Sequence, residues 1–386
     1  MLFFFSMLAM MADNVEHVIS YWMIFQKFNS PALGGFAVVS HWVPFLLFSV
    51  SVGALADRAD PRRLMQLGML LFIIVSAAWG YFFLTDSLEM WQAMLLLVIH
   101  GCAGVLWNIP NQLLLYVLVR PADLPSAVRL SAMSRYLGIL VGPGIGAAIM
   151  MMLGPSLGII VNTLFYLPLL VWLFFAPARD AAVAVQRFAV RGFGEVVAAF
   201  KAIAAHRVLS SMTLLAGGTS FLIGNAYSAQ MPGYAVDLGH GDADMSYSLL
   251  LAADAAGAIL AGVALEAWGN FKTTARRAII MAMCWTIVLI AFAWSRSLSL
   301  AVLLLFAAGF FELSFNTMAQ ALVQINAPKD MRGRVIGVFN MSGLGLRAFS
   351  GVSVGLLGAG IGIHWSLTCA AVILLVGLSI IFARNR

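Results

Sequence analysis

Side chains that can hold a proton lie inside stretches that are otherwise apolar. Asp13, Glu16 and His17 fall within residues 2–25 at the spacing i, i+3, i+4, which places them on one helix face. Asp13 and His17 are one helical turn apart, close enough to share a proton. Glu312 is the only acid within residues 298–325. Because ionisable groups in apolar helices are costly and point to function, we predict that these four residues handle protons.

Amide and imidazole groups accompany these acids. Asn316 and Gln320 continue a stripe from Glu312 at steps of four along one helix face. The other groups lie within residues 90–118 and 207–235; they are His100, Asn108, Asn111, Gln112, Asn225 and Gln230. Such donors and acceptors can bind the polar parts of a small molecule. The alternative is hydrogen bonding between helices, which contributes about 0.6 kcal/mol per contact in a membrane. Asp254 and Arg347 are expected to form a structural ion pair.

The composition excludes most soluble classes of protein. The 386-residue chain is 62% hydrophobic and 10% charged, whereas soluble domains average roughly 25% charged residues. The net charge of +6 does not indicate nucleic-acid binding, because the basic residues are scattered over short loops. A phosphate-binding glycine loop, a nucleophile elbow and a zinc motif are all missing from the sequence. We therefore expect a membrane protein that is not an enzyme and uses no cofactor or metal.

Stretches of about 20 apolar residues are long enough to cross a bilayer. Reading the chain in such windows predicts twelve spans: 2–25, 33–56, 64–85, 90–118, 127–152, 156–177, 207–235, 244–269, 276–295, 298–325, 334–357 and 361–383. Nearly all of the 22 Lys and Arg residues fall in loops on one side, and the opposite loops hold only Lys27 and Arg296. The basic side is cytoplasmic, which puts both termini there. His41, His240 and His364 lie near outer span ends, where interfacial positions are expected rather than metal ligation.

The spans divide into two halves that repeat. Residues 178–206 form the one long break, and within them 191–201 reads as an amphipathic helix on the cytoplasmic face. We therefore expect a six-helix bundle at 1–177, a linker at 178–206 and a second bundle at 207–386. The segment from Gly262 through Glu266 to Gly269 repeats the earlier pattern around Gly53 and Asp57 at a nearly constant offset. Repeats in register indicate a duplicated unit.

A charged turn between the second and third spans carries the clearest motif. It runs Gly53-Ala54-Leu55-Ala56-Asp57-Arg58-Ala59-Asp60-Pro61-Arg62-Arg63. This order resembles the loop signature G-x-L-a-D-r-x-G-r-r of the major facilitator superfamily, with Asp60 in place of the second Gly. The resemblance implies a gating role for Gly53, Asp57, Arg58 and Arg62, and for Gly262, Glu266 and Gly269 in the repeat. A carboxylate such as Asp57 can accept bonds from a neighbouring helix N-terminus.

A second motif in the fifth span concerns the branch of the family. Residues 135–147 resemble the antiporter signature G-x-x-x-G-P-x-x-G-G, which is associated with exporters, through Gly138, Gly142, Pro143 and Gly146. Small residues four apart also form a smooth groove for another helix, and both interpretations can hold together. Leu97 stands where many proton-coupled relatives carry an Arg. Further features resemble those of the enterobactin-exporter or transmembrane secretion effector branch, namely Asp13 and residues 108–111 and 332–335.

These features together predict a secondary transporter in a bacterial inner membrane. We expect a monomer that exports a small amphiphilic molecule, siderophore-like or drug-like, by alternating access and proton antiport. Two alternatives remain. One is uptake, or transport of a lipid such as a lysophospholipid, by the same fold. The other is a non-transporting membrane sensor or assembly protein, which would have no need for acids in the helices that line the central cavity in this fold.

Overall fold

The computed structural model describes residues 1–28, 31–176, 192–224, 226–238, 243–267, 273–350 and 357–385. These residues form helices and no strand. Eight helices within them are long and apolar enough to cross a membrane, and shorter apolar helices accompany them. The chain forms two compact units. The first comprises residues 1–127, 134–197 and 329–337, and the second comprises residues 128–133, 198–328 and 338–386.

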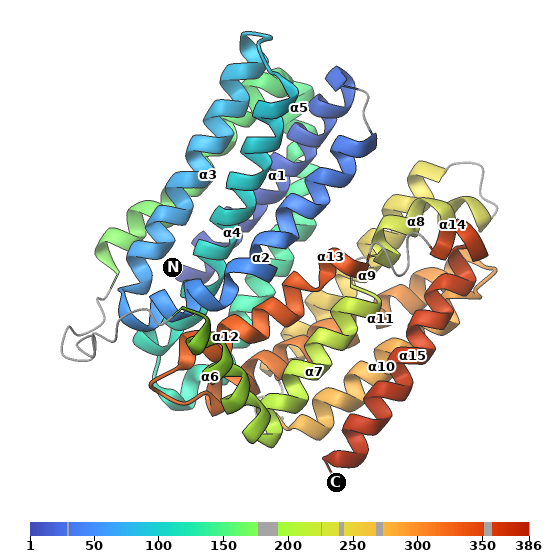
Figure 1. Cartoon of the computed structure of the whole chain (residues 1–386). Coiled ribbons are helices and arrows are strands. Elements are labelled where there is room, and N and C mark those ends of the chain that lie inside the picture. The colour runs from blue at the N-terminus through green and yellow to red at the C-terminus, as the bar shows by residue number, and fades with distance from the viewer. Residues whose placement is uncertain are drawn as a thin grey trace. The chain divides into compact units, whose positions relative to one another are not determined.

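The first unit is built from long helices that run alongside one another (Figure 1). They are α1 (Leu2–Phe28), α2 (Pro31–Arg58), α3 (Pro61–Leu84), α4 (Met90–Leu118) and α5 (Leu124–Phe175), with the short helix η1 (Pro121–Asp123) before α5. Both α2 and α3 pack against α4. The two spans expected at 127–152 and 156–177 are joined as α5, which bends at Gly154. The φ of 75° at Gly154 is one that glycine adopts without steric cost.

The second unit begins with a helix that is interrupted midway. Its helices are α7 (Arg207–Leu222), α8 (Ala226–Asp237), α9 (Ala243–Ala267), α10 (Ala275–Ala293), α11 (Leu298–Asn326), α13 (Arg347–Ser350), α14 (Leu357–Ile361) and α15 (Ile363–Arg384). Between α11 and α13 the chain forms α12 (Arg332–Asn340) and the π-helical turn η3 (Met341–Gly345). Helix α11 packs against α9, α10 and α7, and α10 packs against α15.

Two expected spans are therefore broken. The span expected at 207–235 stops after Leu222, because Gly224 has a φ of 48°, which a helix does not continue through. A side chain at Gly224 would also meet the Ser350 side chain. The span expected at 334–357 changes to π geometry at Met341. The segment expected to be amphipathic is α6 (Gly192–Ala205), in which Ala199 is buried and Phe200 is exposed.

Corresponding crossings in the two halves use glycine in the same way. A Cβ on Gly101 of α4 would meet the Ser40 carbonyl of α2. In the second unit, a Cβ on Gly309 of α11 would meet the Asp254 carbonyl of α9. These crossings join the second and fourth spans of each half, and only a residue without a side chain allows such a close approach.

Candidate functional site

The first unit contains a buried network of acids around one imidazole. His100 of α4 lies between two acids of α1: its Nδ1 is 2.8 Å from Glu16 Oε1 and its Nε2 is 2.8 Å from Asp13 Oδ1. The Ser76 hydroxyl of α3 donates to Glu16 Oε2. A neutral imidazole has only one N–H, so the two hydrogen bonds require one further proton.

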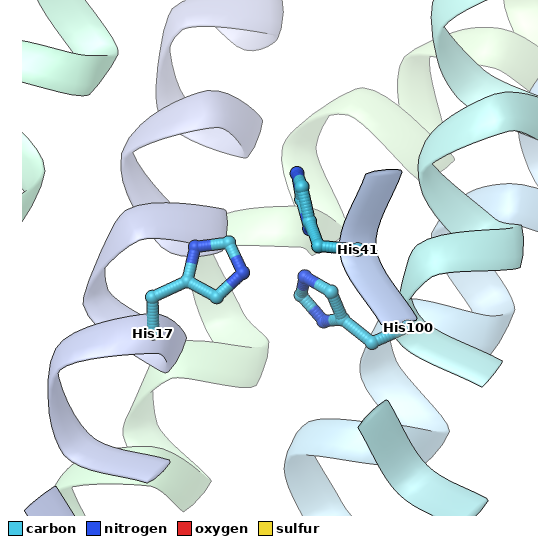
Figure 2. A group of neighbouring side chains, drawn as sticks. All are labelled: His17, His41 and His100. Carbon is cyan, nitrogen blue, oxygen red and sulfur yellow. The ribbon is translucent and has the colours of Figure 1, made fainter. Parts of the chain in front are cut away.

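Two more histidines adjoin this network. His17 Nδ1 is 3.8 Å from Asp13 Oδ2, and the ring centroids of His17 and His41 are 4.8 Å apart. The His17 ring is also 4.8 Å from that of His100. Figure 2 shows His17, His41 and His100 gathered at one place. The interfacial position expected for His41 stays a prediction, while α2 brings its ring to 4.8 Å from that of His17 on α1 and to 5.8 Å from that of His100 on α4. His100, which the sequence suggested for substrate binding, is hydrogen-bonded to acids, and a substrate role for it stays a prediction.

The second unit contains a different acidic site. The Tyr227 hydroxyl of α8 is 3.0 Å from Glu312 Oε2 of α11 and 3.3 Å from Asp254 Oδ2 of α9. The expected pair of Asp254 with Arg347 is corrected: among the described residues, Asp254 has Tyr227 and Glu312 as its neighbours. The expectation assumed one unbroken helix through Arg347, whereas the π-helical turn η3 precedes it. Sequence reasoning missed Tyr227, although Gly224 ahead of it was a visible signal for a helix break.

The amide groups are only partly placed. The Gln112 amide donates to Asn108 Oδ1 across one turn of α4, at 3.0 Å. Asn111 is buried, and Asn316 and Gln320 are partly buried on α11. Asn225 and the Gln230 side chain lie outside the described residues. A substrate role for these amides therefore stays a prediction.

Asp57 binds the start of a helix, as the motif predicts. Its carboxylate accepts the backbone N–H of Gly333, and that of Arg334 at 3.2 Å, at the start of α12. Arg334 Nε is also 3.2 Å from Asp57 Oδ2. A Cβ on Gly53 would meet the Gly333 carbonyl, so the backbone of α2 and the backbone at the start of α12 approach closely at this point. The site is a carboxylate bound at the positive end of a helix.

Asp60 and Arg62 fix the turn that follows. Asp60 caps α3 by accepting the Arg62 backbone N–H at 3.0 Å, and its carboxylate pairs with the Arg62 guanidinium at 2.6 Å. Arg62 also donates to the Ala176 carbonyl, directly after α5. Burial alone would raise the pKa of Asp60, but the hydrogen bonds from Arg62 and its charge outweigh burial and lower the pKa. Arg58, at the end of α2, is partly buried.

The glycines of the antiporter-like segment face α1. A Cβ on Gly138 would meet Met10, one on Gly142 would meet Asn14 and Met11, and one on Gly146 would meet Val15. Pro143 is exposed. In the second unit, Gly262 lies against Met133, while the Glu266 side chain and Gly269 lie outside the described residues. The small residues thus form a groove that receives the backbone of α1.

Comparisons with known proteins agree with this architecture. The chain is similar to the human organic anion transporter MFSD10 (TETRAN), with a TM-score of 0.73 and 14% identity over 98% of this chain and 97% of that one. It is also similar to the Escherichia coli fucose:proton symporter FucP, with a TM-score of 0.72 and 12% identity over 100% and 98%. No curated protein sequence matches significantly. At these identities the solved structures show the fold alone.

A family model covers nearly the whole sequence. The model described as Major Facilitator Superfamily matches residues 2–351. With the apolar helices of both units, this match makes the chain a multi-pass membrane protein with the twelve-helix fold of secondary transporters. The chain belongs to the Major Facilitator Superfamily.

Proposed function

We propose that the protein exports a small amphiphilic molecule in exchange for protons. The observation that carries this proposal is the Tyr227 hydroxyl between Glu312 and Asp254, at 3.0 and 3.3 Å. One hydroxyl has one hydrogen to donate, and two nearby carboxylates disfavour each other's ionisation. A proton on one of the two carboxyls supplies a second hydrogen for bonding and removes the repulsion between two negative charges. The pair is therefore suited to bind a proton in one state and release it in another.

The neighbouring amides supply a route from proton to substrate. Asn316 and Gln320 follow Glu312 along α11 at one-turn intervals. A substrate that hydrogen-bonds to this stripe approaches Glu312, and its arrival displaces the shared proton towards the cytoplasm. Reprotonation from outside, after substrate release, then permits the return step. Asp13 is the second candidate for coupling, but its carboxylate is already bonded to His100.

The fifth span supports the proposed direction of transport. Gly138, Gly142 and Gly146 match the exporter-associated signature and pack on α1. This feature supports export, and the resemblance to the enterobactin-exporter branch supports a siderophore-like or drug-like substrate. We also propose that the protein acts as a monomer in a bacterial inner membrane, with both termini in the cytoplasm, as the distribution of its basic residues favours. Uptake, or lysophospholipid transport, is the runner-up, and transport by everted vesicles separates it from export.

Glu312→Gln in purified protein reconstituted into liposomes tests the coupling site. A panel of catecholate siderophores and amphiphilic antibiotics first identifies a transported compound. We expect the Glu312→Gln protein to lose uptake driven by a pH gradient, about tenfold or more, while it keeps substrate exchange at equal pH, because only the proton step needs a titrating group. Glu89→Gln, which changes an exposed acid at the start of α4, is the matched control. An undiminished response of Glu312→Gln to the gradient would exclude this acid from coupling.

A further inference from the structure

Three histidines from three helices of the first unit gather at one place. His17 comes from α1, His41 from α2 and His100 from α4 (Figure 2). One ring nitrogen of each lies within 4.8 Å of the others. Neutral imidazole is the commonest metal ligand in proteins. The separation is larger than in a loaded site, because zinc–nitrogen bonds of about 2.0–2.1 Å place ligand nitrogens about 3.4 Å apart. A loaded site therefore requires the three side chains to rotate toward one another.

A fourth ligand already stands beside the histidines. The Asp13 carboxylate is 2.8 Å from His100 Nε2 and 3.8 Å from His17 Nδ1. An ion that replaces the hydrogen between Asp13 and His100 would be bound by both groups. Three imidazoles and one carboxylate form a nitrogen and oxygen set that suits zinc and its first-row neighbours. The three histidines and this acid come from three helices, so an ion here would tie α1, α2 and α4 together.

The groups behind His100 are arranged as they are in metal sites. While Nε2 faces Asp13, Nδ1 lies 2.8 Å from Glu16, and the Ser76 hydroxyl donates to that same carboxylate. Metal-binding histidines usually donate their second N–H to a carboxylate, which fixes the tautomer and the ring orientation. Glu16 can therefore keep its hydrogen bond while His100 binds an ion through the other nitrogen. Glu16 and Ser76 would act here as positioning residues.

One buried nitrogen of the cluster lacks a hydrogen bond. His17 Nε2 is inaccessible to solvent and has no partner among the residues that the structure describes. An unsatisfied buried polar atom is destabilising, so a ligand for this nitrogen would remove that cost. The His17 side chain as a whole is 20% exposed, which leaves one open side by which an ion can arrive.

We propose that His17, His41, His100 and Asp13 bind a divalent first-row transition ion, with zinc as the best match. The site lies in the first unit and uses none of Glu312, Asp254 or Tyr227. It therefore goes beyond the proposed transport function and does not rest on it. The proposal departs from the expectation from sequence that the protein binds no metal and that His41 is not a metal ligand.

Cobalt titration of the full-length protein in detergent, with any histidine tag removed, tests the site. Cobalt bound tetrahedrally by nitrogen and oxygen absorbs visible light, and zinc should displace it. We expect one saturable ion per chain, and a higher Tm with zinc than without it. His41→Gln and His17→Gln should each weaken binding at least tenfold. His364→Gln, which alters a histidine paired with Asp237 in the second unit, should bind as the wild type does.

The same variants distinguish a lost ligand from a lost fold. Metal-free Tm and size-exclusion profiles show whether each variant is folded, and His17→Gln carries the test if His41→Gln is not. Glu312→Gln should bind cobalt normally, so the metal site and the coupling site can fail independently. The proposal is overturned if the wild-type protein gives no saturable cobalt band at stoichiometric concentration. It is equally overturned if folded His17→Gln binds as the wild type does, because the ion then sits elsewhere.

Discussion

Asp60 has two partners in the turn between α2 and α3. It accepts the Arg62 backbone N–H and so caps α3, and it pairs with the Arg62 guanidinium, which in turn reaches the Ala176 carbonyl. The side chain therefore ties the start of α3 to the residue after α5. This position is a glycine in the family signature, so the contact is a feature of this chain's own sequence.

The pH dependence of stability reports on that contact. The pKa of Asp60 in the folded protein lies below its ordinary value, which is about 3.9. The stabilisation is therefore present above that value and is lost as the pH falls through the folded pKa. Asn caps a helix nearly as well as Asp, so Asp60→Asn removes mainly the ion pair. We expect its Tm to lie about 1–2 °C below wild type at pH 7, with the two values converging as the pH falls below the lowered pKa of Asp60. A difference independent of pH would contradict this assignment.

Asp57 is the residue whose charge holds the start of α12. Its carboxylate accepts two backbone N–H groups and faces Arg334 Nε. Asp57→Asn keeps the shape but removes the charge, which should weaken the contact by about 1–3 kcal/mol. We expect normal insertion and transport lowered about fivefold or more, measured in vesicles at matched protein levels. Asp86→Asn, at an exposed acid paired with Lys27, should transport normally. Full transport by a correctly inserted Asp57→Asn protein would remove this role.

At the scale of elements, α5 shows how a glycine can be tested with its neighbour as the control. A Cβ on Gly142 would meet Asn14 and Met11, whereas a Cβ on Gly144 would meet nothing within 4 Å. Both changes to leucine have the same effect on helix propensity. Gly142→Leu should therefore force α1 and α5 apart, lower the Tm by several degrees and block cycling.

Gly144→Leu should leave stability and transport close to wild type. Thermal unfolding and vesicle transport measure both variants side by side. If Gly142→Leu turned over normally, the packing of α1 on this groove would not matter to the cycle. If both variants failed equally, the cause would be a general intolerance of leucine in this segment.

The helices were predictable from sequence to different degrees. Apolar length predicted α3, α4, α10 and α11 closely, because their ends carry charged or capping residues such as Asp60 and Glu89. The same signal ran through Gly224, because an apolar window does not register a single glycine with a positive φ, whereas the bend at Gly154 falls between the two expected spans. Breaks inside apolar segments are set by backbone conformation and neighbouring packing, which composition does not report.

The sites were harder to predict than the helices. The stripe of Asp13, Glu16 and His17 was visible as helical spacing, and the contact of Asp57 followed from the loop motif. The meeting of His41 with His17 and His100, and of Asp254 with Glu312, depends on how each helix is rotated. Helices that are apolar on every side give little hydrophobic periodicity from which to infer that rotation. Pairing Asp254 with Arg347 followed charge alone and was wrong for that reason.

At the scale of the whole molecule, the duplication and the family membership support one account. Glycine crossings recur in both halves at Gly101 and Gly309, and the family model spans residues 2–351. The two units nevertheless bear different polar groups, because the first holds the imidazole network and the second holds the carboxyl pair. We infer that the repeated helices provide the scaffold and that each half has acquired its own chemistry.

Proton movement in everted membrane vesicles tests the central claim most directly. Vesicles with an acidic lumen, made from cells with the wild-type or the Glu312→Gln protein, receive the panel of siderophores and antibiotics. We predict that wild-type vesicles accumulate at least one compound, that the lumen becomes more alkaline as they do so, and that Glu312→Gln vesicles show neither change. Accumulation that persists after an ionophore collapses the pH gradient, or that Glu312→Gln vesicles match, would contradict proton-coupled export through this site.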